Sequence, residues 1–383
     1  MYLYSINNSK KKGIKTHRKE KNLQKSFFYI KKLSFFKKAS KLRNMKVGLN
    51  GFGRIGRNIL RAYLERGDSK FEIVAINDLA DTATNAHLLK YDSVHGTLDY
   101  DISSSEDSIS VGNQTFKCFS ERNPEDLPWK ELGVDIVFEC TGIFTTREKA
   151  SLHLKAGASK VIISAPGKDV DRTVVFGVNH EELTSNDAII SNASCTTNCL
   201  APLAKVINDN FVITNGLVNT IHAYTNDQSL LDVYHSDLLR ARAAGQSMIP
   251  TKTGAASAVG EVIPELNGKL NGLAVRVPVA NVSLLDFTFN TEKDFTVEEL
   301  NTVLEQASLN ELRGVLDVNS VPLVSTDFKG NTNSSVYDKL HTQKIDKNTK
   351  ILAWYDNEWG FSNRMLDLTS YVVENLATQD IAA

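Results

Sequence analysis

The sequence predicts two domains, an α/β domain with a doubly wound, mostly parallel sheet and an α+β domain with an antiparallel sheet. The first is indicated by a glycine-rich loop between a strand and a helix, and by strand and helix patterns that alternate as far as residue 164. The second is indicated by alternating apolar residues at 282–289 and a helical pattern at 297–307. We expect the domains to span residues 45–194 and 195–357.

The composition is that of a globular protein. At 383 residues, with 42% hydrophobic residues, 23% charged residues and a net charge of −1, the chain can bury the cores of two domains. No apolar run approaches the roughly 20 residues that span a bilayer, so we expect no membrane association. The four cysteines are too few and too irregularly spaced for a disulfide framework or a zinc site. We therefore expect a reducing compartment and no bound metal.

The first 44 residues differ from the rest in charge. They hold 14 Lys and Arg residues against the single acidic residue Glu20, so the remainder of the chain carries a net charge of about −14. A secretory signal is disfavoured because the segment lacks an apolar stretch of 7–15 residues. We expect this basic leader to be disordered. Three interpretations remain open: an upstream extension of a reading frame that begins at Met45, a targeting segment, or a basic arm for anionic surfaces.

A dinucleotide-binding signature opens the first domain. A short strand at 46–50 runs directly into Gly51-Phe-Gly-Arg-Ile-Gly56, and a helix with one apolar face follows. G-x-G-x-x-G in this setting is typical of a Rossmann domain. Gly51 permits the tight turn, Gly53 lets the backbone approach a pyrophosphate, and Gly56 allows close packing of helix on strand. The pyrophosphate is expected at the helix N-terminus.

The second strand, at 71–76, supplies a candidate ribose ligand. Asp78 lies 22 residues after Gly56, close to the spacing of the acid that binds the adenosine ribose hydroxyls. A carboxylate there repels a 2′-phosphate, which favours NAD over NADP; the alternative is an ordinary turn residue. Further strands are expected at 135–139 and 161–164, with an antiparallel excursion at 97–120.

The stretch around Cys195 predicts a reactive thiol. Ser194 is a good N-cap, and apolar residues recur behind it at helical spacing, so Cys195 falls in the first turn of a helix. The helix dipole and free N–H groups there stabilise an anion and lower a thiol pKa. Cys195 is thus a candidate nucleophile, the alternative being a small buried core residue. Cys199, one turn later, is expected to be structural.

The remaining candidates lie between residue 216 and the C-terminus. His222 directly follows a strand at 216–221 and would serve as the base for Cys195, the alternative being a structural or surface histidine. The long loop 226–252 is typical of a functional segment. Four residues in or after it suit phosphate binding, although single arginines are often merely solvated. They are Arg240, Thr253, Gly254 and Arg276. A last helix at 365–376, within segment 358–383, could pack back on the first domain.

Six motifs together carry a family resemblance. They are NGFGRIGR at 50–57, SCTTNC at 194–199, HAYT at 222–225, TGAA at 253–256, RVP at 276–278 and WYDNE at 354–358. In this order they resemble phosphorylating glyceraldehyde-3-phosphate dehydrogenase, from Met45 to about residue 377.

The resemblance implies a role for each matched residue. Cys195 would be the nucleophile and His222 its base. NAD contacts would come from Arg54, Ile55, Asp78, Arg122, Ser164 and Asn357, the last holding the nicotinamide carboxamide. Thr225 and Arg276 would bind the phosphate of the substrate glyceraldehyde 3-phosphate. Ser194, Thr196, Thr253 and Gly254 would bind inorganic phosphate, with Arg240 between the two pockets. The family is typically a cytoplasmic homotetramer whose long loop lines the cofactor site of a neighbouring subunit.

The chain departs from the family pattern at several positions. Tyr234 stands where many NAD-using members have Pro, and Phe361 replaces a common Tyr near the cofactor. Two alternatives stay open. An erythrose-4-phosphate dehydrogenase shares the scaffold, although Thr225 favours the triose phosphate. A catalytically silent NAD- or RNA-binding protein could use the basic leader, although Cys195 and His222 argue against it, and no nucleic acid is needed for the main interpretation.

Overall fold

The computed structural model describes residues 44–67 and 70–375. The chain divides into two units, Met1–Asn44 and Met45–Ala383, and the second is described below. The prediction of a disordered basic leader falls on residues outside this description, as does the end of segment 358–383.

The first sheet has the predicted doubly wound architecture. Among the described residues it holds nine strands in the order β10-β11-β9-β8-β1-β2-β7-β6-β5. All neighbours are parallel except β5-β6 and β6-β7, which form the expected antiparallel excursion. The strands are β1 (Met45–Asn50), β2 (Phe71–Asn77), β5 (Ile102–Ser104), β6 (Ser108–Val111), β7 (Gln114–Phe119), β8 (Ile136–Glu139), β9 (Lys160–Ile163), β10 (Arg172–Thr173) and β11 (Ile189–Ser191). A separate hairpin pairs β3 (Tyr91–Asp92) with β4 (Gly96–Thr97).

Helices connect these parallel strands, and two of the four begin at a side-chain cap. Asp81 accepts a hydrogen bond from the backbone N–H of Thr84, and Thr146 accepts one from that of Lys149, so each satisfies a helix amide that has no partner within its helix. The helix after the glycine loop instead has no side-chain cap, which leaves its first amides to a ligand. The helices are α2 (Arg54–Arg66), α3 (Thr82–Lys90), α4 (Trp129–Leu132) and α5 (Arg147–Lys155).

The second sheet is mixed, which corrects the prediction of an antiparallel sheet. Its seven strands, among the described residues, follow the order β13-β14-β12-β15-β18-β17-β16. The pairs β12-β14 and β16-β17 are parallel, and neither pair is joined by a tight turn. Helix α7 (Ala255–Val262) lies on the first connection, and a short 3-10 helix, Ser325–Phe328, lies on the second. The strands are β12 (Ile213–Ala223), β13 (Ile249–Lys252), β14 (Leu270–Val277), β15 (Ser283–Thr291), β16 (Leu316–Asn319), β17 (Ser335–Ile345) and β18 (Asn348–Tyr355).

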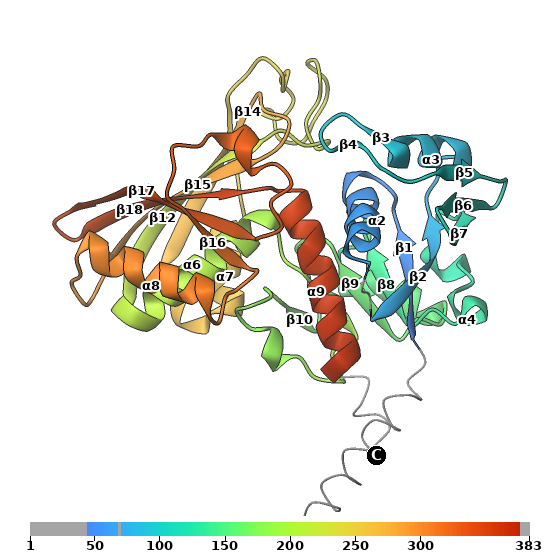
Figure 1. Ribbon diagram of the computed structural model, residues 1–383, viewed down its shortest axis with the longest axis horizontal. Coiled ribbons are helices and arrows are strands. Elements are labelled where there is room, and N and C mark those ends of the chain that lie inside the picture. The colour runs from blue at the N-terminus through green and yellow to red at the C-terminus, as the bar shows by residue number, and fades with distance from the viewer. Residues whose placement is uncertain (1–43, 68–69, 376–383) are drawn as a thin grey trace, which may run out of the picture. The chain divides into compact units, whose positions relative to one another are not determined.

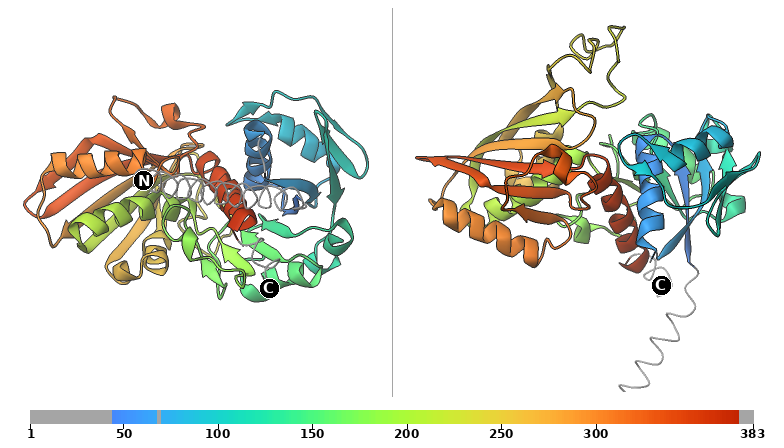
Figure 2. Two further views of the ribbon diagram at one scale, coloured as in Figure 1. Left: turned by 60° about the horizontal axis from the view of Figure 1, so that its bottom comes forward. Right: turned by 45° about the horizontal axis from the view of Figure 1, so that its top comes forward.

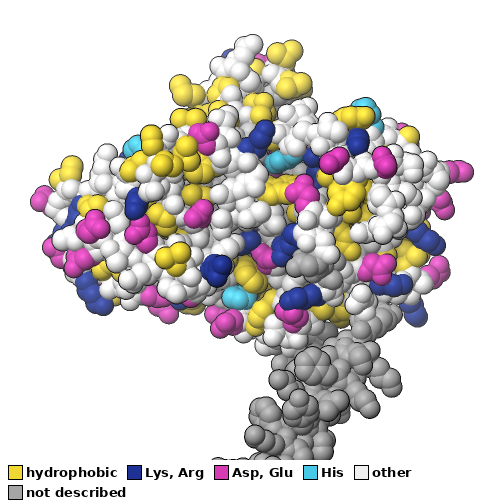
Figure 3. All heavy atoms as spheres, viewed as in Figure 1, with side chains coloured by type: hydrophobic (Ala, Val, Ile, Leu, Met, Phe, Trp, Pro, Cys, Tyr) yellow, Lys and Arg dark blue, Asp and Glu magenta, His cyan; other side chains and the backbone are white. Residues whose placement is uncertain are grey.

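Three helices cover one face of this sheet and enclose the larger core (Figure 2). They are α6 (Cys195–Phe211), α7 (Ala255–Val262) and α8 (Val297–Leu309). Phe287 and Phe289 of β15 point into this core, as their two-residue spacing predicts. On the opposite face Leu217 and Leu273 are exposed, and apolar side chains also cover the projecting loop before β13 (Figure 3).

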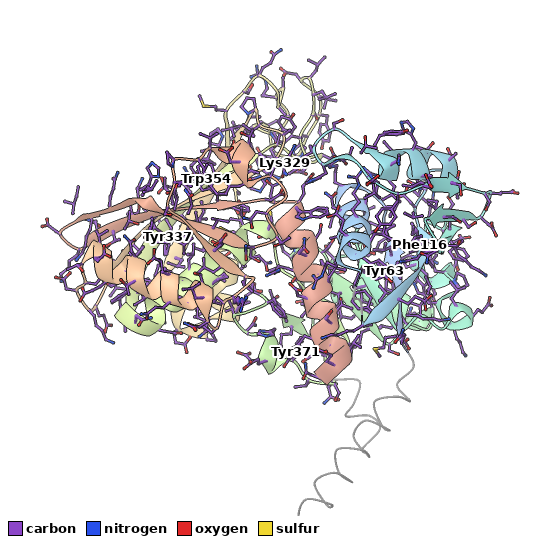
Figure 4. The ribbon with its side chains drawn as sticks, in the orientation of Figure 1. Tyr63, Phe116, Lys329, Tyr337, Trp354 and Tyr371 are labelled. Atoms are coloured by element: carbon purple, nitrogen blue, oxygen red, sulfur yellow. The ribbon has the colours of Figure 1, made fainter. Side chains whose placement is uncertain are left out.

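Neighbouring strands β17 and β18 illustrate how the sheet alternates (Figure 4). Tyr337 is fully buried, and its hydroxyl donates to Asn301 of α8 at 2.5 Å. Trp354, paired with Val336 in the next register position, packs on Phe328 with the ring centroids 5.2 Å apart. Each strand therefore contributes to two separate apolar clusters.

The last helix returns to the first sheet. α9 (Trp359–Asn375) begins six residues before the predicted start at 365 and packs against α2 and α6 (Figure 1). Met365, Leu368 and Val372 are its buried stripe. The domain boundaries 45–194, 195–357 and 358–383 stay predictions. Among the described helices, none is long and apolar enough to cross a membrane.

Candidate active site

Cys195 is the first residue of α6, directly after the turn that leaves β11. Ser194 caps the helix as predicted, because its hydroxyl accepts a hydrogen bond from the backbone N–H of Thr197 at 3.0 Å. The backbone N–H groups of Cys195 and Thr196 both stabilise charge on the sulfur. The thiol thus lies at the positive end of a 17-residue helix.

His222 lies beside this thiol. The Cys195 Sγ and His222 Nε2 atoms are 3.5 Å apart, so the structure brings the predicted nucleophile and base together. His222 Nδ1 is 2.6 Å from the carbonyl oxygen of Ala223, which can only accept a hydrogen bond. Arg276 Nη1, which can only donate, also lies near Nδ1, but at a longer 3.2 Å. Because the carbonyl contact is the shorter of the two, we assign the ring proton to Nδ1, which leaves the lone pair of Nε2 facing the thiol.

Burial dominates the electrostatics of this pair. Burial and the charge of Arg276 lower the pKa of His222 to about 3. Burial also raises the pKa of the Cys195 thiol, which outweighs the opposing charge of Arg276. The expected lowering of the thiol pKa is therefore wrong for this structure. The resting pair is a neutral thiol beside a neutral imidazole that is free to accept its proton.

Arg276 supplies an unneutralised positive charge beside the pair. Its Nη1 donates to the carbonyl of Ala223 at 3.1 Å and to Thr225 Oγ1 at 3.3 Å. Its Nε is buried without a hydrogen-bond partner, and no carboxylate among residues 44–67 and 70–375 forms an ion pair with it. A half-buried guanidinium without a counter-ion is costly unless an anion binds there. The structure thus brings Thr225 and Arg276 together, and their binding of a substrate phosphate stays a prediction.

The other predicted phosphate residues lie in or after the long loop. Arg240 is engaged within it, since it pairs with Asp227 and its Nε donates to Thr251 at 2.9 Å. Thr253 and Gly254 stand at the N-terminus of α7, where Gly254 is the cap residue and provides no side chain. Part of the predicted loop is strand β13, which pairs with β14 next to Arg276.

Two hydroxyls predicted to bind inorganic phosphate already have protein partners. Ser194 Oγ serves the helix cap, and Thr196 Oγ1 lies 2.8 Å from the Tyr355 hydroxyl. Tyr355 also contacts Thr220 Oγ1 at 2.6 Å, and its ring stands edge-on to His222. Tyr355 thus fixes both the helix start and the imidazole, a role that its place in the 354–358 motif could have suggested.

The glycine loop has the geometry that its sequence predicts. Gly51 adopts a φ of 92°, and a Cβ there would lie 2.7 Å from the backbone nitrogen of Thr141. A Cβ on Gly56 would lie 2.2 Å from the carbonyl oxygen of Gly51, so helix and loop pack without room for a methyl group. At Gly53 a Cβ would meet nothing within 4 Å, which leaves open space at the uncapped N-terminus of α2. This cradle fits a pyrophosphate.

The acidic residue of the predicted ribose site holds the loop in place. Asp78 accepts hydrogen bonds from the backbone N–H groups of Phe52 at 2.7 Å and Ala80 at 3.0 Å. Arg54, predicted to contact the cofactor, is instead paired with Asp92 and Glu358. Its pKa is raised, because these two carboxylates outweigh the effect of burial.

The remaining predicted cofactor residues lie near strand ends and at a helix start. Ile55 is in the first turn of α2, Arg122 is exposed after β7, and Ser164 follows β9. Asn357 follows β18, and its Oδ1 accepts a hydrogen bond from Ser283 Oγ at 2.9 Å, which leaves its Nδ2 as a donor for a ligand. Nothing in the sequence around Ser283 indicated this contact.

Two further predictions concern metals and Cys199. No group of three or more His, Cys, Asp or Glu side chains among the described residues is placed to hold a metal ion. Cys199 is fully buried with its Sγ 3.4 Å from Ser335 Oγ, and burial raises the pKa of its thiol to about 12. An inert thiol there agrees with a structural residue.

Comparison with known proteins decides the family. Residues 45–147 match the model for the NAD-binding domain of glyceraldehyde 3-phosphate dehydrogenase, and residues 194–357 match that for its C-terminal domain. The chain belongs to this family. It is 59% identical over 325 residues to the plasmid-encoded glyceraldehyde-3-phosphate dehydrogenase of Cupriavidus necator, which covers 84% of this chain and 97% of the relative.

Two other relatives carry the same family name. The glyceraldehyde-3-phosphate dehydrogenase of Pseudomonas aeruginosa is 59% identical over 324 residues, 84% of this chain and 96% of its own. Glyceraldehyde-3-phosphate dehydrogenase 1 of Bacillus cereus is 55% identical over 329 residues, 85% of this chain and 98% of its own. The glycine loop therefore belongs to an NAD-binding domain, and the cradle at Gly53 fits that cofactor.

Gly53 provides a test of this cradle. Gly53→Ala should leave the fold intact, because the added methyl group meets no protein atom, but it should weaken NAD binding about tenfold or more by blocking the approach of the pyrophosphate. Calorimetric titration with NAD measures the affinity and the thermal midpoint measures stability. Gly245→Ala, also without neighbours within 4 Å, is the matched control. An unchanged affinity for NAD in Gly53→Ala would contradict the assignment.

Arg276 should govern thiol reactivity. In Arg276→Gln the thiolate of Cys195 loses its nearest positive charge, so alkylation by neutral iodoacetamide at pH 8 should slow about tenfold. In the unaltered chain the alkylation rate should rise with pH into the alkaline range. It should show no separate step near pH 6, because His222 is already neutral at that pH. Mass spectrometry locates the label. Arg313→Gln, on an exposed arginine, is the control, and equal rates for both variants would reject the role.

Proposed function

We propose that this chain oxidises D-glyceraldehyde 3-phosphate to 1,3-bisphosphoglycerate with NAD and inorganic phosphate, in glycolysis or gluconeogenesis. The observation that carries the proposal is the Cys195–His222 pair beside an unneutralised Arg276. A thiol that can transfer its proton supplies the nucleophile, and the guanidinium supplies the site for a phosphorylated aldehyde. The matching family and relatives support the same reaction.

In the proposed reaction, Cys195 forms a covalent bond to the aldehyde carbon. The Nε2 lone pair of His222 takes the thiol proton as Sγ attacks and passes it to the aldehyde oxygen, which gives a hemithioacetal and a neutral imidazole. His222 then takes the hydroxyl proton of this adduct as the hydride leaves. NAD, when bound, supplies the hydride acceptor. The product on Cys195 is a thioester. Hydrogen phosphate attacks its carbonyl carbon, the acyl phosphate is released, and the sulfur takes up the phosphate's proton, which restores the neutral thiol.

The remaining roles follow the positions of the side chains. Thr225 and Arg276 would hold the substrate's phosphate, while Thr253 and Gly254 at the start of α7 would receive the incoming phosphate with Arg240 nearby. Ser194 and Thr196 would contribute to the same pocket, Thr196 chiefly through its backbone N–H because its hydroxyl is bonded to Tyr355. Each role remains a proposal.

The cofactor contacts are likewise proposals. Gly51, Gly53, Arg54, Ile55 and Gly56 would surround the pyrophosphate, with Asp78 and Arg122 toward the adenosine and Ser164 along the strand edge. Asn357 would hold the nicotinamide carboxamide through Nδ2, since Ser283 occupies its Oδ1.

We further propose that the chain assembles as a homotetramer in the cytoplasm. The loop before β13 exposes large apolar side chains that a lone subunit would leave in water. They are Leu230, Leu231, Val233, Tyr234, Leu238 and Met248, with exposed fractions between 57% and 93%. Leu217 and Leu273 add to the open face of the second sheet. Burial of these surfaces by further copies of the chain is the simplest way to remove them from water.

The nucleophile can be tested by substitution. Cys195→Ser should keep NAD affinity and lose nearly all oxidation of glyceraldehyde 3-phosphate, because a hydroxyl beside a neutral imidazole is a far weaker nucleophile. Without phosphate, the unaltered chain should release one equivalent of NADH and carry an acyl group on Cys195, detected by mass spectrometry. Cys118→Ser is the control. Turnover by Cys195→Ser would reject the mechanism, and faster turnover of erythrose 4-phosphate would favour the related dehydrogenase.

The proposed tetramer can be tested by placing charged residues on its exposed apolar loop. Sedimentation should give about four times the 42.4 kDa of one chain. Replacing exposed Leu230 and Leu238 by Asp should dissociate this species, because four copies would each place charges in an apolar contact. Leu309→Asp, equally exposed but at the end of α8, is the control. A monomer in the unaltered chain would contradict the tetramer.

A further inference from the structure

The turn that delivers Cys195 contains a strained residue. Between β11 and α6, Ala193 adopts a φ of 56°, in the left-handed region that residues with a Cβ rarely occupy. Ala193 is also buried, and its methyl group belongs to the core around α6. The strain therefore lies two residues before the sulfur, where a change of backbone path would move the nucleophile.

Asn198 forms hydrogen bonds to the residues on both sides of Ala193, and we call this pair of hydrogen bonds the clasp. Its Nδ2 donates to the carbonyl of Asn192 at 2.8 Å and to that of Ser194 at 3.0 Å, the residues directly before and after Ala193. Because both partners are carbonyl oxygens, only the amide nitrogen can face them, which fixes the orientation of the side chain. Asn198 is fully buried and sits one turn along the helix that begins at Cys195.

Ser191 joins the same turn to the first sheet. Its hydroxyl donates to the carbonyl of Ala165 at 2.8 Å, and it accepts from the backbone N–H groups of Ala193 at 3.1 Å and Gly167 at 3.0 Å. The turn is thus held between α6 on one side and the loop after β9 on the other. The side-chain hydrogen bonds of Ser191 and Asn198 within the described part of the chain go to this turn and to the loop after β9, and none goes to Cys195 Sγ or His222.

We propose that Asn198 and Ser191 are positioning residues that hold Ala193 in its left-handed turn and so keep Cys195 Sγ within reach of His222. Without the clasp, Ala193 relaxes toward an ordinary backbone conformation, and the first turn of α6 shifts with it. The sulfur then leaves the 3.5 Å contact on which proton transfer depends. This inference rests on the proposed role of Cys195. It assigns a function to two residues that do not take part in the proposed chemical steps.

A double-mutant cycle separates this role from general stability. In a chain that keeps Ala193, Asn198→Ala should lower both the rate of Cys195 alkylation by iodoacetamide and kcat about tenfold. In a chain that also carries Ala193→Gly, the same substitution should cost less than about threefold, because glycine needs no help to adopt a positive φ. The affinity for NAD, measured by calorimetry, should change little. Asn210→Ala is the matched control, since its Nδ2 bonds the carbonyl four residues earlier on the same helix.

The outcomes are distinct. Equal losses with and without Ala193→Gly would overturn the proposal, as would an Asn198→Ala rate equal to that of Asn210→Ala. If Asn198→Ala fails to fold, Ser191→Ala is the second variant. It should likewise slow alkylation, and Ala193→Gly should again reduce that loss. Alkylation reports the position of the thiol in the protein without substrate. A chain that alkylates as expected but does not oxidise the aldehyde would therefore reject the proposed function and leave the clasp intact.

Discussion

The 3.5 Å contact between Cys195 Sγ and His222 Nε2 is the interaction on which the site depends, because each atom comes from a different part of the chain's architecture. Cys195 is delivered by a turn at the edge of the first sheet, whereas His222 ends a strand inside the second. Helix α6 joins the two, since it begins at Cys195 and then packs across the second sheet. Any shift of this helix along its axis would separate nucleophile from base. The buried apolar stripe of α6 is therefore part of the catalytic geometry as well as of the core.

Electrostatics and packing oppose each other around this contact. Burial keeps both groups neutral, which would leave the thiol a poor nucleophile. Arg276 works against burial at Cys195, and the same charge disfavours protonation of His222. The pair therefore rests with its proton on sulfur and a basic nitrogen beside it. An anion on Arg276 would offset the free-energy cost of burying the guanidinium, so the proposed binding of a phosphorylated substrate there would change the local charge balance.

Local patterns in the sequence predicted the parts of the site that depend on local geometry. The cap at Ser194, the tight turn at Gly51 and the close packing at Gly56 follow from steric and hydrogen-bonding rules within a few residues. Strand order in the second sheet was not predictable in this way, because parallel pairs such as β12-β14 arise from long connections. The direction of the thiol pKa also escaped prediction, since a helix N-terminus is visible in sequence and burial is not. Tyr355 and Ser283 act across 74–159 residues of chain, beyond any local pattern.

An ion pair joins the start of α2, directly after the glycine loop, to the segment that follows β18. Arg54, directly after Gly53, pairs with Glu358, 304 residues later and next to Asn357. Glu358 also accepts from His95 at 2.9 Å, and its pKa is lowered because Arg54 and His95 outweigh burial. The glycine loop and the amide proposed for the nicotinamide are thus tied together by ion pairs that do not use the cofactor. The resemblance assigned Arg54 to NAD itself. In the structure its guanidinium instead pairs with two carboxylates, which hold the first turn of α2 beside Glu358.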